Sequence, residues 1–289
     1  MGNSKQTINF VSGKIIMGLE IDIEQIIRDR SPKGAKWIPR PLFGWLKRLI
    51  RQREINDVLR KYGHREGTAF IEAVLDEWGY HPQVHLAAPI DPEKKYIFAS
   101  NHPLGGIDGL ILAAEIERRF GPVKIMVNDL LMHLAPVRSL FVPVNKYGKQ
   151  SADYARELDK MYRSADQVLL FPAGLCSRKI SAQVQDIGWK KNVITKAVQY
   201  QRDIIPIFFD AQNSKAFYRT ASLRQAIGLK FNLELVLLPG EMFRQPNKNM
   251  SIYFGRPIPF QTFTREKRPE EWAAWLREQA YTLKQNNTP

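Results

Sequence analysis

The strongest constraint on the fold is an alternation, beginning after Gly79, between short apolar runs and amphipathic segments. The apolar runs predict strands over residues 84–87, 96–100, 123–127, 141–144, 167–171, 204–209, 233–238 and 251–254. The segments between and after them predict helices over residues 109–120, 152–164, 189–201, 221–227 and 269–284. Because strands that alternate with helices form βαβ units, we expect an α/β fold with a mixed, largely parallel sheet flanked by helices.

The first eighty residues have a different pattern, in which helical periodicity is interrupted by prolines. Helices are predicted there over residues 18–30, 41–62 and 66–78. No internal repeat, low-complexity run or Gly/Ser linker interrupts the remainder of the chain. We therefore predict a helical, membrane-associating N-terminal region over residues 1–80 and an α/β domain over residues 81–289.

The chain carries a formal net charge of +14, which implies an acidic partner such as nucleic acid or an anionic lipid surface. Much of the excess lies between Arg28 and Arg65, where twelve Lys and Arg residues accompany three acidic residues. From Leu42 onward, apolar residues recur at helical spacing with basic residues between them, a pattern typical of a helix that lies in a lipid interface. The side chains expected to contact the membrane are Trp37, Arg40, Phe43, Trp45, Lys47, Arg48 and Arg51.

The alternative interpretation of this basic stretch is a core-packing helix with a solvated face. No zinc-finger, RNA-recognition or basic-zipper signature is present, so we expect no nucleic-acid partner. No apolar run approaches the roughly 18–20 residues needed to span a bilayer, and the N-terminus lacks the apolar core of a signal peptide. Together with a single cysteine, Cys176, these features predict a peripheral protein on the cytoplasmic face of a membrane, without a transmembrane helix.

A candidate catalytic pair follows the strand predicted over residues 96–100. The residues from Asn101 to Asp108 read Asn-His-Pro-Leu-Gly-Gly-Ile-Asp and lead into a predicted helix. A histidine thus leaves a strand and an aspartate opens a helix, with a flexible glycine pair between them that lets the carboxylate return to the imidazole. Asp108 would then fix the tautomer of His102, whose other ring nitrogen would take a proton from an alcohol. The alternative role of Asp108 is a simple helix cap.

A second candidate segment follows the strand predicted over residues 167–171. It reads Phe-Pro-Ala-Gly-Leu-Cys-Ser-Arg over residues 171–178. Gly174 lets the backbone approach a ligand closely, and Arg178 can form a bidentate hydrogen bond with a phosphate or carboxylate. The alternative is an exposed turn with a solvated arginine. Both candidate segments lie at the carboxyl ends of predicted strands, where α/β sheets bind ligands.

The two segments resemble signatures of the glycerolipid and lysophospholipid acyltransferase superfamily, in which 1-acylglycerol-3-phosphate acyltransferases are found. The first family signature is Asn-His, four arbitrary residues and Asp, whereas five residues separate His102 from Asp108 here. The third signature is Phe-Pro-Glu-Gly-Thr, an arbitrary residue and Ser. In this sequence Ala173 replaces the glutamate and Leu175 replaces the threonine.

Two further blocks follow in the family order, so the resemblance covers roughly residues 84–260. The run over residues 141–146 ends in Lys146 where the family usually has a headgroup-binding arginine, and residues 204–207 resemble an apolar block that contains proline. The variant with alanine after Phe-Pro resembles the haemolysin-like branch. That branch includes O-acyltransferases for amino-acid-containing lysolipids such as lyso-ornithine and lyso-glycine lipids.

The resemblance implies an enzyme that moves a fatty acyl chain from an acyl carrier protein or coenzyme A thioester to the free hydroxyl of a lysolipid. An amino-acid-containing lysolipid would present a carboxylate, and lysophosphatidate is the alternative acceptor. The implied catalytic residues are His102 and Asp108. The implied substrate-binding residues are Asn101, Gly105, Gly106, Lys146, Phe171, Pro172, Gly174, Ser177 and Arg178.

In the expected mechanism, His102 removes the hydroxyl proton and later returns it to the departing thiolate. Backbone N–H groups near Gly105 and Gly106, or at the helix start, are expected to stabilise the oxyanion. This mechanism requires no metal ion, cofactor or covalent acyl-enzyme. The competing interpretations are a lipid or thioester hydrolase that uses Cys176 with His102, and a membrane-docking protein without catalytic activity.

Overall fold

The computed structural model of the 289-residue chain describes residues 10–11, 14–15, 20–144, 152–180, 183–226, 236–245 and 249–285. Its main element is a seven-stranded sheet with the strand order β3-β11-β10-β4-β7-β5-β6. These strands are β3 Gln83–Leu86, β4 Tyr96–Ser100, β5 Val123–Asn128, β6 Phe141–Val144, β7 Gln167–Leu170, β10 Asp203–Asp210 and β11 Ser251–Phe254. Neighbouring strands pair in parallel, except that β10 and β11 are antiparallel. The predicted α/β fold with a mixed, largely parallel sheet is confirmed.

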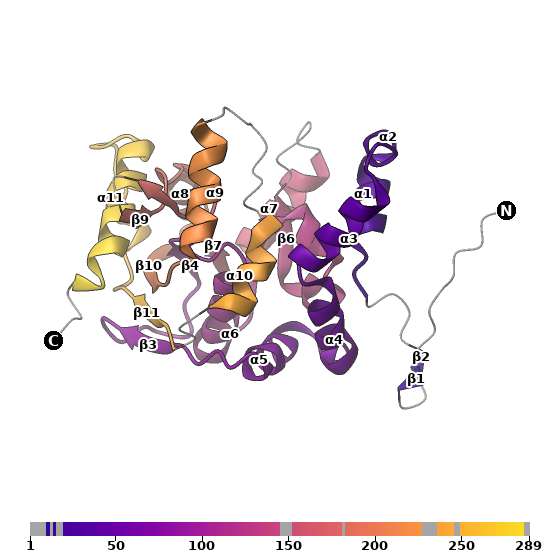
Figure 1. Ribbon diagram of the computed structural model, residues 1–289. Helices are drawn as coiled ribbons and strands as arrows, with labels where there is room; N and C mark the ends of the chain where they lie inside the picture. The colour runs from indigo at the N-terminus through magenta and orange to yellow at the C-terminus, as the bar shows by residue number, and fades with distance from the viewer. Residues whose placement is uncertain are drawn as a thin grey trace.

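Helices precede, connect and follow the strands (Figure 1). They are α1 Ile23–Arg30, α2 Pro32–Ala35, α3 Arg40–Leu49, α4 Gln52–Tyr62, α5 Gly67–Glu77, α6 Ile107–Phe120, α7 Ala152–Arg163, α8 Asn192–Tyr200, α9 Lys215–Ala226, α10 Leu238–Arg244 and α11 Pro269–Thr282. The 3-10 helices include η1 Asp129–His133, η2 Ala135–Leu140 and η4 Phe260–Thr262. Two small antiparallel pairs complete the described elements, β1 Phe10–Val11 with β2 Lys14–Ile15 and β8 Arg178–Ile180 with β9 Gln183–Gln185.

Different helices cover the two faces of the sheet, because successive residues of a strand point to opposite faces. On the central strand β4, Tyr96 and Phe98 pack into a core that includes α5 and α6. Ile97 and Ala99 of the same strand pack into a second core that includes α7, α8 and α11. All residues of β4 are buried, so the residues that follow this strand begin in the interior of the protein.

The N-terminal helices divide into two groups. Buried side chains of α4 and α5, such as Leu59, Ile71 and Val74, belong to the same core as β4 and α6. In contrast, α1, α2 and α3 lie together at one end of the molecule, and α11 lies at the other end (Figure 1). Among the described helices, none combines the length and apolar character that a membrane span requires.

The prediction of a single helix over residues 41–62 is wrong. The structure has two helices there, α3 and α4, which are separated at Arg51. This arginine has a left-handed backbone conformation with φ of 56°, which interrupts helical geometry. Its guanidinium contacts Glu54 at 2.6 Å and lies over the ring of Phe243 in α10, 5.7 Å from the ring centroid. The apolar pattern continues across the break and conceals it.

The prediction of a strand over residues 233–238 is also wrong for residues 236–238, the part that the structure describes. These residues are helical, and Leu238 begins α10. Pro239, with its fixed φ and missing N–H, suits the first turn of a helix better than the interior of a strand. Leu238 packs against Cys176, Phe217 and Tyr218 in a small cluster outside the two main cores. The apolar character of Leu238 therefore serves this cluster instead of the sheet.

Candidate active site

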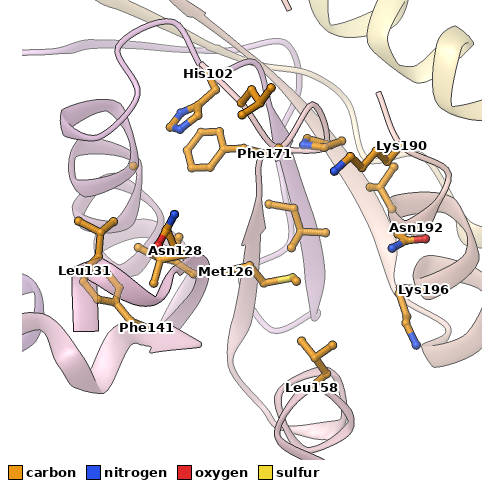
Figure 2. A pocket seen from close by; sticks show the side chains of 18 of the residues that line it. His102, Met126, Asn128, Leu131, Phe141, Leu158, Phe171, Lys190, Asn192 and Lys196 are labelled. Atoms are coloured by element: carbon orange, nitrogen blue, oxygen red, sulfur yellow. The ribbon is translucent and has the colours of Figure 1, made fainter. Parts of the chain in front are cut away.

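The two candidate segments meet at the carboxyl ends of β4 and β7, because these strands are adjacent and parallel. The residues that follow each strand line a cavity of about 540 Å³. Apolar side chains form much of its wall, including Ile125, Val127, Leu131, Leu158 and Leu170. Figure 2 shows His102 and Phe171 side by side at one end of the cavity and Leu158 at the other. The cavity thus lies where an α/β sheet is expected to bind its ligand.

His102 and Asp108 form the predicted pair. The Nδ1 atom of His102 lies 3.0 Å from Oδ2 of Asp108. The Asp108 side chain is fully buried, whereas 17% of the His102 side chain is exposed, at the cavity. Gly105 helps to accommodate the additional residue between them with φ of +73°, a conformation that glycine adopts readily. Because Nδ1 contacts the carboxylate, Nε2 is the nitrogen that can act on a substrate.

Four backbone N–H groups hold the Asp108 carboxylate. Leu104 and Gly105 donate to Oδ2 at 2.9 and 3.3 Å. Gly106 and Gly109 donate to Oδ1 at 3.0 and 2.9 Å. Gly105 and Gly106 both line the cavity, but their N–H groups are already bonded to the carboxylate. These two N–H groups are therefore engaged within the protein, and stabilisation of the oxyanion by donors near the glycine pair or at the helix start stays a prediction.

The charge state of Asp108 suits a partner of an imidazolium. Burial favours the neutral acid, but the His102 side chain and the N–H groups of Leu104 and Gly109 outweigh it and lower the pKa of the Asp108 carboxyl. The carboxylate is therefore ionised at neutral pH. A carboxylate in this position orients the imidazole and would stabilise a positive charge on it.

Asp186, which the sequence did not indicate, positions His102 through its backbone. Its Oδ1 atom accepts hydrogen bonds from the N–H of His102 at 3.2 Å and from the hydroxyl of Ser177 at 2.5 Å. Its Oδ2 atom accepts one from the indole of Trp189 at 2.9 Å. Burial raises the pKa of the Asp186 carboxyl, although these hydrogen bonds oppose that effect. Asp186 therefore joins the second candidate segment to the segment that contains His102.

Two predicted substrate-binding residues, Asn101 and Ser177, have structural contacts instead. Asn101 donates from Nδ2 to the carbonyl of Phe209 at 3.0 Å and accepts from the N–H of Phe209 at 2.7 Å. This double contact joins the end of β4 to β10. Ser177 donates to Asp186. Both residues are buried and neither lines the cavity, so they position the loops that do.

Arg178 does not reach the cavity either. It is buried at the start of β8, where Nη1 donates to the carbonyl of Cys176 at 3.0 Å. Its guanidinium lies over the ring of Phe217 in α9, 5.9 Å from the ring centroid. Tertiary packing directs the side chain toward α9, so this position does not support the prediction that Arg178 binds the acceptor headgroup.

Phe171, Pro172 and Gly174 line the cavity as predicted. The ring of Phe171 stacks on the imidazole of His102, with ring centroids 4.0 Å apart and an angle of 27° between the planes. This stacking restricts the orientation of His102. Gly174 has φ of +69°, and its N–H donates to the carbonyl of Phe171 at 2.9 Å, which closes a tight turn. Lys146, the remaining predicted substrate-binding residue, lies outside the described residues.

Cys176 lines the cavity but lacks the features of a nucleophile. Its thiol is buried and donates to the carbonyl of Pro103 at 3.2 Å. Burial raises the pKa of the Cys176 thiol well above its usual range, which keeps the sulfur protonated. This environment argues against the hydrolase that pairs Cys176 with His102. Within the described ranges, no group of His, Cys, Asp and Glu side chains is arranged to hold a metal ion.

The residues predicted to contact a membrane differ in exposure. Trp37 is 88% exposed and Trp45 is 53% exposed, and Arg40 and Arg48 are also exposed. Phe43 is only 2% exposed, so the prediction that it contacts a membrane is wrong. It lies on the inward side of α3, because a helix turns about 100° per residue and places Phe43 away from its neighbours.

The two remaining basic residues of this set have acidic partners. Lys47 lies 3.1 Å from a carboxylate oxygen of Asp22 and 3.2 Å from one of Glu24. Arg51 pairs with Glu54. These acidic partners partly balance the charges of Lys47 and Arg51, and both side chains are partly buried. Arg40 and Arg48 are therefore the stronger candidates for contact with an acidic surface.

Comparison with known proteins identifies several similar proteins. A sequence model of a family described as "Acyltransferase" matches residues 25–288. A lyso-glycine lipid O-acyltransferase of Bacteroides thetaiotaomicron is 40% identical over 264 residues, which cover 91% of this chain and 97% of that protein. A lyso-glycine lipid O-acyltransferase of Phocaeicola vulgatus is 36% identical over 264 residues, with coverage of 91% and 95%. The crystal structure of a 1-acyl-sn-glycerophosphate acyltransferase from Thermotoga maritima has a TM-score of 0.47, 11% identity, and coverage of 92% and 94%.

Proposed function

The chain belongs to the acyltransferase family, and from this premise we propose that it transfers a fatty acyl chain from a thioester to the free hydroxyl of a lyso-glycine lipid. The observation that carries the proposal is the contact between His102 and Asp108 at one end of an apolar cavity. Both similar proteins from Bacteroides and Phocaeicola are named for this acceptor.

The chemistry of the proposal follows from the position of Nε2 of His102. This nitrogen accepts the proton of the acceptor hydroxyl while the hydroxyl oxygen attacks the carbonyl carbon of the thioester. The carbon–sulfur bond then breaks, and His102 returns the proton to the sulfur. The products are the diacylated lipid and a free thiol. Asp108 stabilises the imidazolium between the two proton transfers.

The cavity supports this chemistry in a second way. Its apolar side chains come from separate elements, including Ile125 of β5, Leu131 of η1 and Leu158 of α7. Such a surface accepts an alkyl chain and excludes water. Excluding water favours transfer to a lipid hydroxyl over hydrolysis of the thioester. The donor in this proposal is the thioester of an acyl carrier protein or of coenzyme A.

The direct test is an assay of acyl transfer with purified protein. Given a lyso-glycine lipid and either acyl-coenzyme A or acyl–acyl carrier protein, the protein is expected to form diacylated lipid and free thiol in equal amounts. Mass spectrometry of the lipids and titration of the thiol measure both products. Free fatty acid without diacylated lipid would contradict the proposal and identify a hydrolase. Faster turnover of lysophosphatidate would identify the alternative acceptor.

We also propose that the protein binds the cytoplasmic face of an anionic membrane through an α2–α3 surface. This surface consists of the exposed side chains of Trp37, Arg40, Leu42, Trp45 and Arg48. Aromatic and aliphatic side chains enter the interfacial layer, and arginines contact acidic headgroups. The proposal is supported by large apolar side chains that are exposed on a basic stretch of the chain.

Replacing Trp37 and Trp45 together with serine is expected to weaken binding to phosphatidylserine-containing vesicles by at least about tenfold. The reason is that the binding free energy from burying the two indole rings, which the variant loses, exceeds about 1.4 kcal/mol. Co-sedimentation with vesicles measures the change. Leu86→Ser is the matched control, because Leu86 is 44% exposed but lies on β3 at the edge of the sheet. Equal vesicle binding by the double variant and the wild-type protein would contradict this surface.

A further inference from the structure

The cavity beside His102 contains basic side chains that the catalytic mechanism does not use. Of the residues that the structure describes, Lys190 and Lys196 are the lysines or arginines that line it. Lys190 precedes α8, and Lys196 lies within that helix. An acceptor with an anionic headgroup that enters the cavity needs a cation nearby, because an unpaired charge is costly to remove from water.

Lys196 is occupied by contacts at the end of the cavity that is formed by α7 and α8. Its ammonium donates to Oε1 of Gln199 at 2.8 Å. It also lies 5.4 Å from the ring centroid of Tyr200 and 6.0 Å from that of Tyr162. Figure 2 shows its terminal nitrogen directed away from His102. Lys196 is therefore poorly placed to contact a headgroup beside the catalytic histidine.

Lys190 lies beside the turn that follows β7. Its backbone N–H donates to the carbonyl of Pro172 at 3.1 Å, which fixes the start of the side chain. Its side chain crosses Gly174: a methyl group on Gly174 would lie 3.0 Å from Nζ and 3.5 Å from Cε of the lysine. Figure 2 shows the amine of Lys190 pointing toward Phe171, the residue whose ring stacks on His102. The turn thus brings an ammonium group to the catalytic end of the cavity.

The surroundings leave the charge of Lys190 without an acidic partner in the described part of the chain. Ala173, which is buried in the same turn, has no charge. Asp159, the acid that lines the cavity, contacts Arg163 at 2.8 Å and the hydroxyl of Tyr200 at 2.7 Å. The neighbouring Lys191 differs, because its ammonium pairs with Glu270 at 2.9 Å. Lys190 therefore presents an unneutralised cation to the cavity.

We propose that Lys190 binds the carboxylate of the acceptor headgroup and so selects a glycine lipid. This inference rests on the proposed function. A glycine whose nitrogen carries an acyl chain keeps one carboxylate with a single negative charge. An ammonium group can meet that charge with a charge-assisted hydrogen bond and needs no planar geometry. Contact with Lys190 would also hold the acceptor hydroxyl at the end of the cavity where Nε2 of His102 acts.

The test compares Lys190→Met with Lys191→Met. Methionine preserves an unbranched, flexible side chain and removes the charge. In Lys190→Met, the KM for the lyso-glycine lipid is expected to rise about tenfold or more, with kcat changed by a smaller factor. In Lys191→Met, both constants are expected to stay within about twofold of the wild-type values, because that lysine pairs with α11 on the surface. Lys190→Arg should restore part of the lost affinity.

A binding measurement separates recognition from turnover. The ligands are N-palmitoylglycine, which has the carboxylate but no acceptor hydroxyl, and its methyl ester, which has neither the charge nor the hydroxyl. The wild-type protein is expected to bind the acid about tenfold more tightly than the ester, as measured by calorimetry in detergent. Lys190→Met should bind the two ligands equally, while Lys191→Met should discriminate as the wild type does.

The outcomes distinguish this inference from the proposed function. If Lys190→Met still prefers the acid by the wild-type factor, or if its KM is unchanged, Lys190 does not bind the carboxylate. If the wild-type protein prefers the acid through Lys190 but acylates no lyso-glycine lipid, the carboxylate site is supported and the proposed reaction is contradicted. Equal melting temperatures of the variants would exclude misfolding as the cause of lost affinity.

Discussion

His102→Ala is expected to lower kcat by about a thousandfold, because the enzyme loses the group that removes the acceptor proton and returns it to the leaving thiolate. The KM for the acceptor should change much less, since the cavity wall that holds the alkyl chain stays intact. Steady-state formation of diacylated lipid at saturating acceptor measures the effect. The variant should remain folded, because the imidazole is near the cavity surface and its main partner is one carboxylate.

His85→Ala is the matched control for this variant. His85 lies on β3 and stacks on the ring of Tyr253, with ring centroids 4.8 Å apart, away from the catalytic end of the cavity. Its replacement should leave kcat within about twofold of the wild-type value, although it removes the same chemical group. Turnover by folded His102→Ala at a rate near that of His85→Ala would remove His102 from the mechanism.

Asp108→Asn is expected to reduce kcat by roughly a thousandfold and to lower the free energy of unfolding by about 3 kcal/mol. The carboxylate accepts four backbone N–H groups and contacts His102. An asparagine amide has one oxygen, so its NH₂ group would face donors that Oδ2 or Oδ1 now satisfies. The amide also fails to stabilise the imidazolium. Urea unfolding and steady-state kinetics measure the two effects separately.

The stability loss in Asp108→Asn should depend on pH in a defined direction. The pKa of Asp108 is lowered in the folded protein, so its carboxylate stabilises the fold fully above the unfolded pKa of about 3.9. This contribution disappears as pH falls through the lower, folded pKa. The gap in unfolding free energy between wild type and Asp108→Asn should therefore be largest near neutral pH and should narrow below about pH 4.

Asp57→Asn provides a surface comparison, because Asp57 forms an exposed ion pair with Arg60. An exposed pair contributes about 0–1 kcal/mol, so this variant should unfold at nearly the wild-type urea concentration. The five contacts of the buried carboxylate indicate that it stabilises the fold. This role would be contradicted if the difference in unfolding free energy between wild type and Asp108→Asn were equally small, or if it increased as the pH is lowered.

Several strands could be predicted closely from local pattern. The strand expected over residues 96–100 is β4, and those expected over 141–144 and 251–254 are β6 and β11 with the same bounds. Each is a short, mainly apolar run with a polar residue or glycine directly after it, and packing in the sheet removes its apolar surface from water. Residues 41–62 were harder, because the hydrophobic pattern there does not reveal the left-handed backbone of Arg51.

The candidate catalytic pair could be predicted from the sequence because His102 and Asp108 are close along the chain. A strand end, a glycine pair and a helix start restrict their relative positions, and the structure places them 3.0 Å apart. Asp186 and Lys190 gave no such signal. They reach the site from a segment beyond β9, through contacts with the residues that follow β4 and β7. No local motif records a contact that depends on the packing of three separate segments.

The amino-acid sequence by itself determined the main strands and the histidine–aspartate pair, because each depends on residues within about twenty positions of one another. The alternation of strands and helices along the chain then determined the α/β class. Only the tertiary structure decided which polar side chains face the cavity. It turned Arg178 toward α9, buried Phe43 on the inward side of α3 and brought Lys190 across Gly174. The physical reason is that exposure and direction depend on what packs against a side chain, and those neighbours come from distant parts of the chain.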